Sequence, residues 1–188
     1  MATPQLFMVL LGCTPPGRHT EQHDVFFGVA RGLKELVEDF NAFWPEAEGR
    51  LHIDAWRPLR SVQGFAVEIS DAGIGNPSSE RLFFINLGGY KAGDFEEYHY
   101  KLVVVGKDRG EAIQKAKQTA FYQHMGFKGA ESHIDDKYGV DVDDCYEIED
   151  ILPASVKSKY RITLKPDPES KEDELQIGYV KIEKLINS

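Results

Sequence analysis

Four pairs of polar residues, each with a spacing of two, are the part of this sequence best suited to chemistry. They are Glu21 and His23, His52 and Asp54, Glu97 and His99, and His133 and Asp135. A spacing of two places both side chains on the same face of an extended chain. If the two pairs in each half of the chain meet in space, each half offers two imidazoles and two carboxylates. That ligand set suits zinc or another divalent ion.

The same pairs also have a purely structural interpretation. The side chains can satisfy one another and nearby backbone amides at strand ends, forming a polar clasp that specifies the fold. We expect the clasp rather than the metal site, because buried polar groups are usually paired whatever the function of a protein. We assign no catalytic or cofactor-binding residue, since the sequence has neither a nucleophile elbow nor a glycine-rich nucleotide motif.

The pairs recur because the chain repeats itself. The stretch LFMVLLG at residues 6–12 returns as LFFINLG at residues 82–88, and HID at residues 52–54 returns at residues 133–135. Self-similarity of this kind indicates two related structural units. We therefore predict a first unit over residues 1–78 and a second over residues 79–188, which carries a C-terminal extension.

Periodicity gives the order of elements in the first unit. Residues 6–11 form a continuous apolar run and residues 23–30 alternate, which is typical of two strands joined as a hairpin. Apolar residues at helical spacing predict a helix from about residue 32 to residue 44, and two more strands follow at 51–56 and 64–69.

The second unit repeats this order, with a helix that starts at the capping-box pattern of Asp108 and Glu111. The stretch YRITLKP, residues 160–166, is expected to be its last strand. The sequence thus predicts an α+β protein made of two β-β-α-β-β units, and we favour a ubiquitin-like β-grasp roll with one helix across one mixed sheet.

The chain also resembles a known family. The stretches LFMVLLG, EQHDVFF, LHID, RLFFINLGGY and EYHYKLVV are similar to the bacterial proteins grouped as domain of unknown function 1543. The resemblance runs from about Gln5 to Leu164. It implies a duplicated α+β architecture and a bacterial cytoplasmic protein, and it implies no catalytic or binding residue because the family has no established activity.

Composition limits the partners. A net charge of −9 and a pI near 5.2 repel phosphate backbones and anionic membrane surfaces, so we expect neither nucleic acid nor membrane as a partner. The two cysteines, Cys13 and Cys145, form no CxxC motif, which favours a reducing cytoplasm. The lipoprotein-like stretch LLGC at residues 10–13 follows an apolar run too short for a signal peptide. The sequence does not indicate an oligomeric state.

Three functional hypotheses remain open at this point. The first, which we favour, is a non-catalytic protein that binds another protein through a sheet face or edge. The second is a metal-binding protein or metal-dependent hydrolase that uses the four polar pairs. The third is a small-molecule binder seated between the two units.

Overall fold

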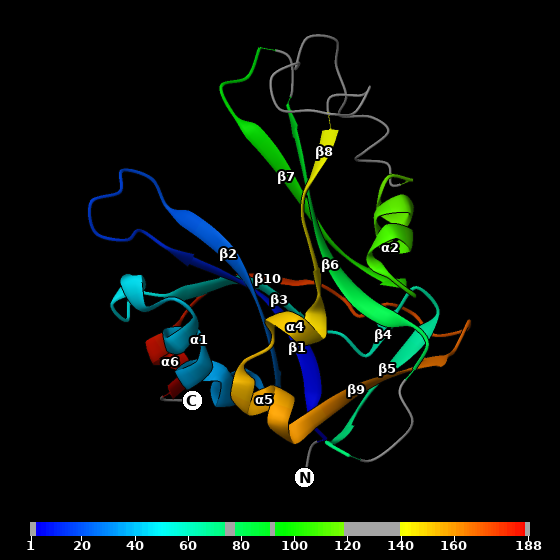
Figure 1. The fold of residues 1–188 in the computed structure, drawn as a ribbon. Coiled ribbons are helices and arrows are strands. Elements are labelled where there is room, and N and C mark those ends of the chain that lie inside the picture. The colour runs from blue at the N-terminus through cyan, green and yellow to red at the C-terminus, as the bar shows by residue number, and fades with distance from the viewer. Residues whose placement is uncertain (1–2, 74–77, 91–92, 119–139, 187–188) are drawn as a thin grey trace. The chain divides into compact units, whose positions relative to one another are not determined.

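The computed structural model describes residues 3–73, 78–90, 93–118 and 140–186, and its contacts divide the chain into two units (Figure 1). Unit 1 consists of residues 1–77 together with residues 152–188, and unit 2 consists of residues 78–151. One boundary falls between residues 77 and 78, next to the expected one, whereas residues 152–188, which we expected in the second unit, group with the first. Unit 2 is therefore an insertion within unit 1.

The main sheet of unit 1 has four antiparallel strands in the order β10-β3-β1-β2. These strands are β1 (Gln5–Cys13), β2 (Gln22–Ala30), β3 (His52–Pro58) and β10 (Gln176–Lys181). The β1–β2 hairpin and β3 lie where the sequence predicts strands. The fourth strand, β10, comes from the far end of the chain and occupies the outer edge of β3.

Short helices cover one face of this sheet. They include η1 (Leu33–Leu36), α1 (Val37–Phe43), η2 (Pro45–Ala47) and α6 (Ile182–Ile186), with α1 and α6 in contact (Figure 1). Leu36 and Phe40 are almost fully buried, as the predicted apolar stripe requires. They pack against alternate residues of β1, namely Phe7, Val9 and Leu11. Gly12, between Leu11 and Cys13, therefore faces away from this core.

A second, three-stranded sheet of unit 1 joins distant parts of the chain. It contains β4 (Ser61–Val62), β5 (Phe65–Asp71) and β9 (Tyr160–Pro166), with the short helix α5 (Ala154–Lys159) leading into β9. We expected residues 160–166 to close the second unit. They pair instead with β5 along its whole length, from Phe65 opposite Pro166 to Asp71 opposite Tyr160.

Unit 2 has one antiparallel sheet in the order β7-β6-β8. Its elements are β6 (Arg81–Tyr90), β7 (Glu97–Gly106), α2 (Arg109–Ala116), β8 (Val140–Glu147) and α4 (Ile148–Ile151). The predicted helix start is present, since the Asp108 carboxylate accepts a hydrogen bond of 2.9 Å from the Glu111 amide. Ala112 and Ala116 bury the helix against β6 and β7.

The fold class is α+β, as predicted, but the sheets are not those of a β-grasp roll. A β-grasp roll needs a mixed sheet, whereas every strand pair within the described ranges is antiparallel. The duplication is visible in the sheets: β2-β1-β3 and β7-β6-β8 share their order, and the central strand meets its second neighbour through the same register shift. In the described part of the chain, no helix has the length and apolar character needed to cross a membrane.

Candidate metal centre

Gly12 lies at the centre of a row of residues that crosses three strands of unit 1. Its Cα partner on β2 is His23, and its Cα partner on β3 is His52. Residues paired in this way project to the same face of a sheet. A Cβ atom at position 12 would collide with His52 Nε2 and with a carboxylate oxygen of Asp54. Glycine therefore leaves the space in which the side chains from both neighbouring strands meet.

Asp54 reaches the same place through a β-bulge. On β1, Leu10 pairs with Ala55 and Leu11 pairs with Ile53, so Asp54 has no partner on that strand. A bulge of this kind re-aims the side chain of the extra residue. The Asp54 Oδ2 atom lies 3.1 Å from His23 Nε2 and 3.3 Å from His52 Nε2.

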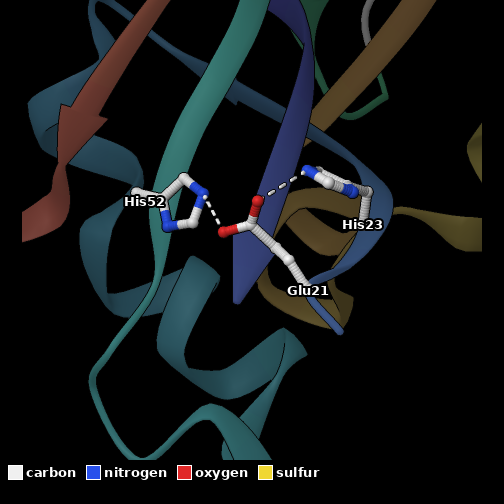
Figure 2. Close-up of side chains that lie close together, drawn as sticks. All are labelled: Glu21, His23 and His52. Atoms are coloured by element: carbon white, nitrogen blue, oxygen red, sulfur yellow. Dashed lines mark ion pairs between the residues drawn. The ribbon is translucent and has the colours of Figure 1, made fainter. Parts of the chain in front are cut away.

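Glu21 completes the group from the residue just before β2. Its carboxylate lies between the two imidazoles, with Oε1 3.1 Å from His52 Nε2 and Oε2 3.6 Å from His23 Nε2 (Figure 2). We call these four residues, Glu21, His23, His52 and Asp54, the first cluster. The proximity predicted from their spacing is thus present in unit 1.

The contacts within the first cluster are close but are not hydrogen bonds. His52 Nε2 and Asp54 Oδ2 are both buried, and neither has a hydrogen-bond partner although they lie 3.3 Å apart. The distance satisfies an ion pair, but the directions do not satisfy a hydrogen bond. The clasp that we expected would pair these atoms, because leaving a buried polar atom unpaired is costly.

Exposure divides the first cluster into an inner and an outer part. The His52 side chain is 6% exposed and that of Asp54 is 26% exposed, whereas Glu21 and His23 are 45% and 39% exposed. His52 and Asp54 therefore form the inner part, which is shielded from water. Glu21 and His23 form the outer part, which is in contact with solvent.

The spacing of the ligand atoms fits a single small cation. Nitrogen and oxygen atoms bound about 2.0 to 2.2 Å from one zinc ion lie about 3.3 to 3.6 Å apart at tetrahedral angles. The four distances between imidazole and carboxylate atoms in the first cluster run from 3.1 to 3.6 Å. One nitrogen or oxygen atom from each of Glu21, His23 and His52 lies within 4.8 Å of the others. Glu21, His23 and His52 can therefore hold one divalent ion between them.

Unit 2 contains a related but less complete group. Gly88 pairs with His99 on β7, and a Cβ atom at this glycine would collide with the Asp143 carboxylate. Asp143 is the extra residue of the β6–β8 bulge, as Asp54 is in unit 1. His99 Nε2 lies 3.3 Å from Asp143 Oδ2 and 4.0 Å from Glu97 Oε2. We call Glu97, His99 and Asp143 the second cluster.

The second cluster differs from the one that the sequence predicts. His133 and Asp135, the expected counterparts of His52 and Asp54, lie outside the described residues. The Cα partner of Gly88 on β8 is Asp141, so Asp141 holds the backbone position that His52 holds in unit 1. The proximity predicted for His133 and Asp135 stays a prediction.

Sequence analysis missed three contributions to these clusters. Asp143 was not among the predicted ligands, although the alternation VDVD at residues 140–143 is typical of a strand. Gly12 and Gly88 end the repeated stretches LFMVLLG and LFFINLG, and that shared glycine was a usable signal. The third contribution is Tyr179 on β10, whose ring centroid lies 4.4 Å from that of His52, and nothing in the sequence indicated it.

The two cysteines do not contribute chemistry to either cluster. Cys13 follows Gly12 but its side chain is buried in the core on the helical side of the sheet. Burial raises the pKa of the Cys13 thiol, and burial likewise raises the pKa of Cys145. A thiol that is harder to ionise is a poorer nucleophile and a poorer metal ligand.

Comparison with known proteins identifies a family segment and a similar structure. Residues 18–69 match the family model described as Domain of Unknown Function (DUF1543), and this segment contains all four residues of the first cluster. No curated protein matches the chain. The crystal structure of a protein Il1583 from Idiomarina loihiensis is similar, with a TM-score of 0.66 and 25% sequence identity over 96% of this chain and 98% of that one. The resemblance noted from the sequence is confirmed over residues 18–69, which match this family model.

Proposed function

We propose that this protein binds a divalent transition-metal ion at the first cluster. Glu21, His23 and His52 would be ligands, and Asp54 would be the fourth. The observation that carries the proposal is the pair of buried atoms, His52 Nε2 and Asp54 Oδ2, which lie 3.3 Å apart without a hydrogen bond. This proposal reverses our expectation of a clasp.

Electrostatics supports the same conclusion. The first cluster brings two carboxylates within 3.6 Å of two imidazoles, and a divalent cation would offset the negative charge of the carboxylates. Burying charged or polar groups without such a partner is unfavourable. The mixed nitrogen and oxygen ligands favour zinc and its neighbours in the first transition series over magnesium and calcium, which prefer oxygen alone.

The second cluster would bind more weakly. Among the described residues it offers one imidazole, whereas the first cluster offers two, and its side chains are 28% to 37% exposed. The His99 to Glu97 distance of 4.0 Å is also longer than any corresponding distance in the first cluster. We therefore expect the first cluster to fill before the second as zinc is added.

Elemental analysis and zinc titration of the untagged protein test the proposal. We expect about one tightly bound zinc equivalent in wild type and its loss in His23→Ala. His19→Ala is the matched control, because His19 is exposed in the loop before β2 and lies outside the cluster. Wild-type protein that carries no metal and takes up no zinc in a micromolar titration contradicts the proposal.

Other expectations stay predictions. These are hydrolytic activity at the metal, a small-molecule ligand between the units, a protein partner and a cytoplasmic location. Two free, buried cysteines are consistent with a reducing compartment. An activity screen of the zinc-loaded protein would follow once metal binding is measured.

A further inference from the structure

The C-terminal strand brings an aromatic ring onto the first cluster. On β10, Ile177 pairs with Ala55 and Val180 pairs with Ile53, so Gly178 and Tyr179 together lie opposite Asp54. This second bulge places the Tyr179 ring 4.4 Å from the His52 ring, centroid to centroid, with 33° between the planes. The neighbouring Val180 packs into the core on the opposite face.

The ring of His52 depends on packing for its orientation. Its Nε2 atom makes no hydrogen bond, so no directional contact on that side holds the imidazole. Gly12 contributes only space beneath it. The aromatic contact with Tyr179 lies against the plane of the ring and can hold it, and residues that contact metal-binding histidines from outside the ligand set orient them and tune affinity.

We propose that Tyr179 is a positioning residue of the metal site, so that the C-terminal strand sets the affinity of a site whose ligands all come from the first 54 residues. The inference rests on the proposed function and extends it. Tyr179 holds the imidazole with Nε2 towards Glu21 and Asp54, and metal binding in turn favours the docked position of β10. Such linkage is reciprocal by thermodynamic necessity.

Unit 2 offers an internal comparison. In unit 1 the strand that carries His52 and Asp54 has β10 along its outer edge. Among the described strands of unit 2, none pairs with the outer edge of β8, the strand that carries Asp143. The second cluster therefore has no described equivalent of Tyr179, which adds a reason for the first cluster to bind metal more tightly.

Cobalt titration of four proteins tests the inference. Wild type, Tyr179→Leu, Tyr179→Phe and Ile177→Ala are titrated with Co²⁺ in competition with a chelator, and the visible absorption of bound cobalt reports both affinity and coordination. We expect Tyr179→Leu to bind about 10- to 100-fold more weakly with an altered spectrum, as for other outer contacts of metal ligands. Tyr179→Phe keeps the ring and should behave as wild type. Ile177→Ala, at an 81% exposed position of the same strand, should also be unchanged.

A second measurement does not depend on metal. In the metal-free protein, the ring protons of His52 should shift in the NMR spectrum of Tyr179→Leu and stay in place in Tyr179→Phe. Equal cobalt affinity in wild type and Tyr179→Leu, or unchanged His52 resonances, overturns the role of Tyr179 while metal binding stands. Failure of wild type to bind cobalt or zinc overturns the proposed function and this inference together.

Discussion

Replacing His52 with leucine distinguishes a metal site from a clasp, because the two predict different stabilities in the absence of metal. The structure leaves His52 Nε2 buried and without a hydrogen bond, a condition that costs about 1 to 3 kcal/mol. Leucine removes that cost and loses the ring contact with Tyr179, which contributes about 0.5 to 1.5 kcal/mol. We therefore expect the free energy of unfolding in EDTA to lie between about 0.5 kcal/mol below and about 2.5 kcal/mol above that of wild type, whereas loss of a clasp lowers it by about 1 to 3 kcal/mol.

Added zinc should stabilise wild type but not His52→Leu. A hundredfold excess of zinc over the dissociation constant stabilises wild type by about 2.7 kcal/mol. For a chain of this size that gain raises the melting temperature by about 5 to 11 °C. His52→Leu should show little of this rise, while His19→Leu, the exposed control, should show all of it.

The assay is a set of thermal melts followed by circular dichroism, each in EDTA and in excess zinc. The reasoning is refuted if His52→Leu melts several degrees below wild type in EDTA and zinc shifts neither protein. An equal zinc-dependent rise in both proteins would also refute it, since zinc would then bind elsewhere.

Three further predictions follow from other parts of the structure. Gly12→Ala should lower the zinc-dependent rise in melting temperature and destabilise the protein by about 1 to 3 kcal/mol, because its methyl group overlaps His52 and Asp54. Gly32→Ala is the control, since its Cβ meets nothing within 4 Å and its φ of −176° is ordinary extended backbone; similar zinc responses in the two variants would contradict the prediction. A fragment of residues 1–77 lacks β9 and β10, the partners of β5 and β3, and should show no cooperative urea unfolding, so a sharp transition of native-like stability counts against this account. Partial burial, with a smaller contribution from Glu38, raises the pKa of Asp39 above its ordinary value of 3.8. Folding then favours the protonated carboxyl, so stability falls as pH rises through the raised pKa. Asp39→Asn should therefore gain more stability over wild type at pH 7 than at pH 3 in urea titrations, and a pH-independent difference would exclude this effect.

Local features were predictable because they depend on nearby residues. The β1–β2 hairpin and the helical region after Gly32 follow from apolar periodicity. The approach of His52 to Glu21 follows from the position of each residue at a strand end. In these cases few other local structures are possible, because the spacing of the apolar residues determines which face of the strand or helix is buried.

Long-range pairing was not predictable from the same patterns. The strand at residues 160–166 has the alternation of a closing strand, but alternation does not say which strand it pairs with, and its partner is β5. Asp141 lies opposite Gly88 as His52 lies opposite Gly12, and the HID repeat did not indicate Asp141. The register between paired strands depends on the bulges at Asp54 and Asp143, and no local sequence pattern predicts these bulges.

The insertion of unit 2 within unit 1 has a consequence for synthesis on the ribosome. All residues of unit 2 have been translated once Ile151 is added, so this unit can fold while the chain is still growing. Unit 1 must wait for β9 and β10, although most of its sheet was made first. Glu21, His23, His52 and Asp54 are therefore translated before unit 2, whereas Tyr179 reaches His52 only after unit 2 has been translated. Nascent chains stalled before and after Tyr179 would differ in how tightly they hold metal.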